Sequence, residues 1–171
     1  VGTNDGDSLL GITAVEHSAN EVLWPALARF LPLYPDISVE VAVDYGLTDI
    51  VAGRYDAGVR LGEQVAKDMI AVRIAPDMCM AVVGSPAYFA RHKKPKVPQD
   101  LMAHNCINIR LPTYGGLYAW EFEKGGRELK VRVEGQLIFN NAAMRLRSVL
   151  VGLGLAYLPE DQARPLIADG R

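Results

Sequence analysis

The order of strand and helix patterns in the first 62 residues restricts the fold more than any other feature of this sequence. Residues 9–14, 37–43 and 56–62 are predicted strands, because apolar side chains are contiguous or alternate along them. Residues 23–34 place apolar side chains three and four positions apart, as on one face of a helix, and residues 47–52 form a second short predicted helix. Strand, helix, strand, helix, strand predicts a parallel sheet with right-handed crossovers.

Proline sets the expected limits of the first helix. Pro25 lies inside the helical pattern, and a proline in a helix interior lacks the N–H that the backbone ladder needs. We therefore expect the helix to begin late, with Pro25 in its first turn, or to kink there. Pro35 and Asp36 should end it.

A second series of elements begins near Met78. Ser85 and Pro86 form a strong helix start, since serine caps helices and proline fits the first helical position. Period-two patterns on both sides of residues 124–127 predict a hairpin. The other elements predicted in this half are strands at 78–84, 106–111, 136–140 and 155–158, and helices that begin near 98, 141 and 159.

Composition narrows the class of protein. Hydrophobic residues make up 50% of the 171 residues and charged residues 22%, which supplies enough apolar material for a core. The net charge of −2 excludes a strongly basic domain that coats nucleic acid. No apolar run approaches the roughly 18 residues of a membrane span, and the polar N-terminus shows no signal peptide. The first residue is Val1, as expected of a processed chain or a fragment.

Charge is divided unevenly along the chain. Residues 1–76 carry a net charge of −6 and residues 77–171 a net charge of +4. The asymmetry suggests two units, the second better suited to an anion, although ordinary variation in composition explains it equally well. We expect any hinge near Ala75, Pro76 and Asp77, where the sign of the charge changes.

Residue types typical of metal sites and catalytic centres are scattered. Cys79 and Cys106 have no metal-ligand spacing, and we expect both thiols to be buried and reduced. The chain contains no Gly-rich phosphate loop, no G-x-S-x-G and no H-E-x-x-H. A triad of His17, Ser18 and Asp44 is conceivable, but adjacent residues at a helix start point their side chains in different directions. We therefore expect no catalytic residues, no metal and no cofactor.

In each half, a strand runs directly into a helix. Ala14 leads to His17 and Ser18, and Asn140 leads to Asn141. Helix N-termini present free N–H groups and a partial positive charge, which bind carboxylates and phosphates. Ligands of open α/β sheets lie beyond the carboxyl ends of the strands. Two such ends facing each other would form a cleft for a small anion; the alternative is that each holds water or a capping side chain.

A series of motifs, in order along essentially the whole chain, resembles the effector-binding domain of LysR-type transcriptional regulators. In the first half they are I-T-A at 12–14, L-A-R-F-L at 27–31 with Y-P-D-I at 34–37, and G-R-Y-D-A-G-V-R-L-G-E at 53–63. In the second half they are G-S-P-A-Y-F at 84–89, P-Q-D-L at 98–101 with H-N-C at 104–106, and G-L-G-L-A-Y-L-P at 152–159.

The resemblance implies an α/β chain with a two-lobed, periplasmic-binding-protein-like (type 2) fold, each lobe a mostly parallel sheet flanked by helices. Lobe I would be residues 1–76 and lobe II residues 77–171, with the chain ending before the family's return to lobe I. It also implies the ligand-sensing and oligomerisation domain of a cytoplasmic regulator, without its winged helix-turn-helix and linker helix.

The same resemblance implies the partners. They are a small effector, expected to be an organic anion bound in the cleft between the lobes, and a second copy of this domain in a homodimer. The full-length protein would form a homo-oligomer, often a tetramer, and would reach promoter DNA only through the missing N-terminal domain. No membrane is involved. The alternative is an extracytoplasmic solute-binding protein of the same fold, which the absence of an export signal, the short chain and above all the motifs disfavour.

By this resemblance, nine residues of the chain correspond to positions in the family's effector pocket. They are His17, Ser18, Asp44, Tyr45, Arg60, Asn108, Arg110, Asn140 and Asn141.

Three of these positions carry open alternatives. Where the family often has Ser or Thr, this chain has His17, which would contact the effector or cap the helix. Asp44 disfavours an anion unless it is paired, for which Arg60 is the candidate. Arg110 is the expected carboxylate partner, because a guanidinium group binds a carboxylate bidentately; the alternative is an arginine at a strand end in solvent.

Overall fold

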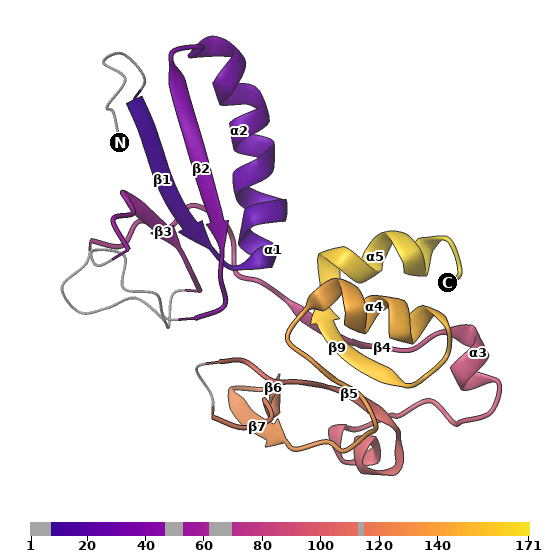
Figure 1. Cartoon of the computed structure of the whole chain (residues 1–171). Helices are drawn as coiled ribbons and strands as arrows, with labels where there is room; N and C mark the ends of the chain where they lie inside the picture. Colours follow the sequence, from indigo (N-terminus) through magenta and orange to yellow (C-terminus); the bar gives the residue numbers. More distant parts are fainter. Residues whose placement is uncertain (1–7, 47–52, 62–69, 113–114) are drawn as a thin grey trace. The chain divides into compact units, whose positions relative to one another are not determined.

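The first half of the chain folds around a three-stranded parallel sheet in the order β2-β1-β3 (Figure 1). The computed structural model describes residues 8–46, 53–61, 70–112 and 115–171, and its contacts divide the chain into unit 1 (Val1–Pro76) and unit 2 (Asp77–Arg171). The strands of unit 1 are β1 (Ser8–Ala14), β2 (Ile37–Val43) and β3 (Ala57–Val59). The predicted parallel sheet is confirmed. The predicted helix at 47–52 lies outside the described residues.

The helix between β1 and β2 begins earlier than predicted. It consists of α1 (Glu16–Ser18), the π-helical segment η1 (Ala19–Leu23), α2 (Trp24–Phe30) and the 3₁₀ turn η2 (Leu31–Leu33). The helical segment as a whole starts earlier than predicted, at Glu16, but Pro25 does lie in the first turn of α2. The π turn widens the helix just before Pro25, where the carbonyl four residues earlier would otherwise meet the proline ring.

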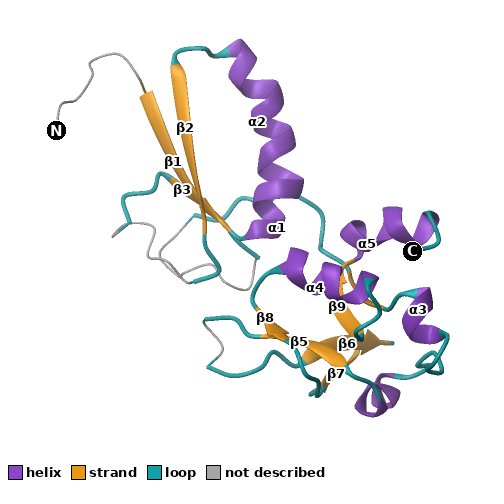
Figure 2. Ribbon diagram, turned by 45° about the vertical axis from the view of Figure 1, so that its right-hand side comes forward, coloured by secondary structure: helices purple, strands orange, loops and turns teal. Residues whose placement is uncertain are grey.

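Unit 2 is built on a four-stranded sheet in the order β4-β9-β5-β8 (Figure 2). The strands are β4 (Met80–Val83), β5 (Cys106–Ile109), β8 (Ile138–Phe139) and β9 (Leu155–Pro159). Only the β4–β9 pair is antiparallel, so this sheet is mostly parallel, as predicted. The predicted hairpin is β6 (Trp120–Lys124) and β7 (Arg127–Val131).

The helices of unit 2 begin where the sequence predicts them. They are α3 (Pro86–Phe89), the 3₁₀ helix η4 (Pro98–Ala103), α4 (Ala142–Leu150) and α5 (Glu160–Ala168). Ser85 caps α3 by accepting a hydrogen bond from the Tyr88 N–H at 3.4 Å. Asn141 caps α4 in the same way, with its Oδ1 2.9 Å from the Met144 N–H. Among the described residues, no helix is long and apolar enough to cross a bilayer.

The main core of unit 2 joins the sheet to the hairpin. The Trp120 ring stacks on Tyr157 of β9, with 5.5 Å between centroids. The Tyr157 hydroxyl donates to the Glu121 carbonyl at 2.6 Å. On the other face of the sheet, Val149 of α4 packs with Ile107 and Leu158. These contacts fix β6 and α4 against the sheet that contains β5 and β8.

Candidate functional site

The polar groups of unit 1 gather where its three strands end, at what we call the unit 1 edge (Thr13, Glu16, Asp44, Tyr45 and Arg60). Ala14 is in register with both Val43 and Val59. Because the strands are parallel, the residues that follow β2 and β3 emerge at the same end of the sheet as the start of α1. The strand register thus brings together three of the predicted site residues: Asp44, Tyr45 and Arg60.

Arg60 is the central cation of the unit 1 edge. Its Nη2 donates to Thr13 Oγ1 at 2.8 Å and its Nη1 to the Val59 carbonyl at 3.1 Å. Burial lowers the pKa of the Arg60 guanidinium from its ordinary value, while the negative charge of Asp44 acts in the opposite direction. The negative charge of Asp44 thus acts on Arg60, and the pairing of the two side chains stays a prediction.

A second acidic group lies at the same edge. The Tyr45 hydroxyl donates to Glu16 Oε2 at 2.5 Å, which joins the end of β2 to the first turn of α1. Sequence reasoning did not select Glu16 or Thr13. The sequence did offer a signal for each: Glu16 is an acidic residue in a first helical turn, and Thr13 is a hydroxyl residue at the end of a buried strand. Neither signal predicts which partner the side chain contacts.

His17 and Ser18 occupy the first helical turn rather than a capping position. The residue preceding the helix is Val15, whose side chain makes no capping hydrogen bond. The alternative in which His17 caps the helix is therefore wrong. His17 is half-buried, whereas Ser18 is only 7% exposed. Of the two, His17 is the side chain that solvent reaches more readily.

The unit 2 edge (Arg110, Asn140 and Asn141) is formed by the ends of β5 and β8. Ile109 is in register with Phe139, and the Arg110 N–H donates to the Phe139 carbonyl at 3.1 Å. This contact places Arg110 beside Asn140, both of them exposed, at the point where the chain enters α4. Asn141 caps α4, so the start of that helix belongs to the same edge.

Asn108 lies apart from these three residues. It is 1% exposed, inside β5, and its Nδ2 donates to the Cys106 carbonyl at 3.4 Å. Its Oδ1 is buried and has no hydrogen-bond partner among the described residues. The structure therefore places Asn108 in the interior of the sheet, not on the open edge with Arg110.

A buried arginine reinforces the positive character of unit 2. Arg145 of α4 is 6% exposed, and its Nη1 donates to the Tyr157 carbonyl. Sequence reasoning missed it, because an arginine one turn into an amphipathic helix ordinarily faces solvent. Its charge lies on the same helix as the Asn141 cap, and adds to the favourable field for an anion at that helix N-terminus.

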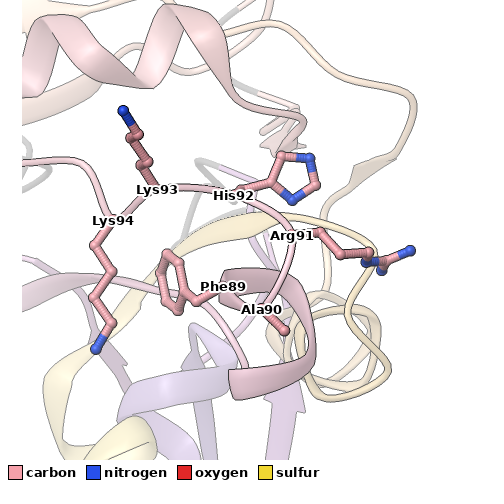
Figure 3. A pocket seen from close by; sticks show the side chains of 6 residues that line it. All are labelled: Phe89, Ala90, Arg91, His92, Lys93 and Lys94. Carbon is pink, nitrogen blue, oxygen red and sulfur yellow. The ribbon is translucent and has the colours of Figure 1, made fainter.

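None of the nine predicted residues lines the depression shown in Figure 3. Six consecutive residues, 89–94, line this open depression of about 380 Å³. Figure 3 shows the side chains of Lys93 and Lys94 pointing away from each other, and His92 and Arg91 pointing elsewhere. Because these basic groups diverge, they do not form a common binding site. No group of three or more metal-ligating side chains occurs in the part of the chain that the structure describes.

Both cysteines carry free thiols, which lie in different surroundings. Cys106 is fully buried, and burial raises the pKa of its thiol to about 12. Cys79 is exposed, so the expectation that both thiols are buried is wrong for Cys79. It falls just before β4, outside the apolar stretch that enters the sheet.

The comparison with known families identifies the family of this chain. Residues 4–171 match the model of the LysR substrate binding domain. The chain belongs to this family. The resemblance inferred from the motifs and the two-lobed α/β fold class are thereby confirmed.

Relatives and solved structures agree with this family. The chain is 53% identical over 160 residues (94% of the chain, 52% of the relative) to a Pseudomonas aeruginosa protein whose name places it among transcriptional regulators. It is 47% identical over 166 residues (97% and 56%) to the HTH-type transcriptional regulator PgrR of Escherichia coli K12. CrgA, a LysR-type transcriptional regulator from Neisseria meningitidis, shares the fold with a TM-score of 0.78 at 21% identity, over 96% of this chain and 54% of CrgA.

These relatives bear on the classes of function considered above. The chain spans about half the length of the curated relatives named here. The family and its relatives are transcriptional regulators and not enzymes, and a solute-binding protein is not favoured. The chain is therefore a LysR effector-binding domain.

Proposed function

We propose that this domain binds a small organic anion and that the carboxylate or similar group of the anion is held at the unit 2 edge. The observation that carries the proposal is the exposed Arg110 beside the capped N-terminus of α4. Helix N–H groups and a guanidinium fork both favour an anion, and the buried Arg145 adds positive charge to the same helix.

In this proposal the unit 1 edge contacts the remainder of the effector. It presents both a cation and acids: Arg60 with Asp44, and the Tyr45–Glu16 pair. Such a mixed set suits hydroxyl or amino groups of the effector better than a second carboxylate. His17 would contact the ligand from the first turn of α1, and units 1 and 2 would be lobes I and II with the hinge near Ala75, Pro76 and Asp77.

The test begins with a thermal-shift screen of small organic acids, amino acids and hydroxy acids, followed by calorimetry on any hit. A ligand at 100 times its Kd stabilises the native state by about 2.7 kcal/mol. We expect Arg110→Ala to weaken the hit at least about tenfold, since a charge-assisted hydrogen bond contributes roughly 1.5–3 kcal/mol. Its melting temperature without ligand should not change, because the Arg110 side chain is exposed.

Two control variants separate binding from folding. Arg127→Ala removes an exposed cation from the hairpin and should leave the affinity unchanged. Asn141→Ser should preserve the helix cap, whereas Asn141→Ala should lose both the cap and part of the affinity. An unchanged Kd in both Arg110→Ala and Asn141→Ala would place the anion elsewhere.

We further propose that the domain forms a homodimer in the cytoplasm and that segments of the full-length protein outside this chain bind promoter DNA. LysR-type regulators as a family oligomerise and bind DNA. Trp24 of α2 is 66% exposed and Leu33 of η2 is 73% exposed, and apolar side chains that gather on one exposed surface are typical of interaction sites. Sedimentation at tens of micromolar should show a dimer for the parent chain and more monomer for Trp24→Glu; a monomeric parent would refute the proposed dimer.

A further inference from the structure

In unit 2, Tyr88, His104 and Asn105 form a hydrogen-bond network whose arrangement depends on the protonation of the histidine. Tyr88 of α3 is 2% exposed, and its hydroxyl oxygen accepts a hydrogen bond from the Asn105 N–H at 3.2 Å. The same hydroxyl lies 3.0 Å from His104 Nδ1. A backbone N–H can only donate, so the buried O–H is satisfied when it donates to an unprotonated Nδ1. This pattern requires neutral His104.

Asn105 connects this group to the rest of unit 2. Its carbonyl accepts from the Leu155 N–H at 2.9 Å, and its Nδ2 donates to the Leu153 carbonyl at 2.5 Å. Its Oδ1 accepts from the Gln136 N–H at 3.0 Å. The Tyr88 hydroxyl therefore attaches α3 to the residue at which the segments entering β5, β8 and β9 meet.

A second histidine contacts the same tyrosine in a way that does not depend on its charge. His92 Nδ1 lies 3.0 Å from the Tyr88 carbonyl and its ring stacks on Tyr88 with 4.1 Å between centroids. A carbonyl only accepts, so His92 donates from Nδ1 in both its neutral and its protonated form. Of the two histidines, only His104 must give up its role as acceptor when it gains a proton.

The charged and titratable groups around His104 come from three elements. His92 follows α3, and its ring centroid is 6.3 Å from that of His104. Asp100 of η4 accepts from the Lys96 and Val97 N–H groups, and these bonds lower the pKa of the Asp100 carboxyl. Burial raises the pKa of the Tyr88 hydroxyl, and the Cys106 thiol of β5 contributes in the same direction. The other basic residues of the stretch after α3 are Arg91, Lys93, Lys94 and Lys96.

We propose that Tyr88, His104 and Asn105 form a pH-sensitive latch, which holds α3 and residues 91–97 on unit 2 while His104 is neutral and releases them when His104 is protonated. On protonation, Nδ1 gains a hydrogen and no longer accepts from the Tyr88 O–H, so a buried donor loses its acceptor. The latch would regulate the basic surface of residues 91–96 independently of the effector.

Amide hydrogen exchange of the whole chain between pH 5.5 and 8 tests the latch. After correction for the intrinsic pH dependence of exchange, we expect amides of residues 85–97 to exchange at least about tenfold faster at pH 5.5 than at pH 8. His104→Gln should abolish this dependence, because its amide does not titrate. Tyr88→Phe should exchange fast at all pH values, because it lacks the O–H.

Two variants at other histidines serve as controls for His104→Gln. His92→Gln should retain the pH dependence, since it removes the histidine whose contact survives protonation, and His17→Gln in unit 1 should behave like the parent. A flat parent profile, or a dependence that persists in His104→Gln, would overturn the proposal. If His104→Gln does not fold, NMR titration of His104 in Tyr88→Phe decides: an unchanged midpoint relative to the parent rules the latch out.

Discussion

Two glycines lie against the backbone at the start of β5, where no other residue fits. A Cβ on Gly154 would stand 2.2 Å from the Asn105 carbonyl oxygen, and one on Gly135 would stand 2.0 Å from that of Cys106. Both distances are far below van der Waals contact with backbone atoms that cannot move aside. The two glycines thus allow the neighbouring segments to pair closely with the strand that ends at Arg110.

Gly154→Ala should therefore destabilise unit 2 strongly. Overpacking costs about 1–3 kcal/mol, occasionally more, and here the clash also disturbs the Asn105 hydrogen bonds. Denaturation followed by circular dichroism, which reports on both units, measures the loss. Gly11→Ala is the matched control, since its Cβ would meet nothing closer than 3.6 Å; equal stability losses in both variants would contradict this account.

The two cysteines should differ in reactivity. Thiolates are the reactive form, and burial raises the pKa of Cys106 to about 12, so this group stays neutral between pH 6 and 9. A thiol reagent at pH 8 should modify the exposed Cys79 rapidly and Cys106 only after denaturant is added. Cys79→Ser protein that reacts fully while folded would show that Cys106 is accessible.

At the scale of elements, the short helix α3 depends on its cap. Four residues are too few for a helix to form unaided, and the Ser85 side chain and carbonyl bind the N–H groups of Tyr88 and Phe89. We expect Ser85→Ala to lower the free energy of unfolding by about 1 kcal/mol and Ser85→Asp to restore much of it. Calorimetry of the three proteins checks this, and a stable Ser85→Ala would show that packing alone holds α3.

At the scale of the whole molecule, charge predicts how the chain behaves toward nucleic acid. Specific DNA binding neutralises several phosphates with Lys and Arg, whereas this chain has a net charge of −2 and its short basic loop lies within residues 91–96. We expect residues 1–171 not to retard duplex DNA at physiological salt. Sequence-dependent retardation by this chain alone would contradict the expectation.

The order of the described strands and helices, the Ser85 cap, the hairpin and the family were determined by the sequence alone. Each depends on local features: the period of apolar residues, a serine before a proline, or motifs in a fixed order. The sequence also selected Arg110, Asn140 and Asn141, which the parallel pairing of β5 and β8 does bring together. Local pattern was sufficient there because residues that follow neighbouring parallel strands must emerge at one edge.

Only the tertiary structure decided which polar side chains meet and which are buried. Asn108 is two positions from Arg110 but lies in the sheet interior, and Glu16 joins Tyr45 across 29 positions of sequence. The burial of Arg145, the Tyr88–His104 contact and the glycine approaches are likewise long-range. Periodicity reports which face of an element is apolar, but the partner of a polar group depends on the register and packing of distant segments, which no local pattern encodes.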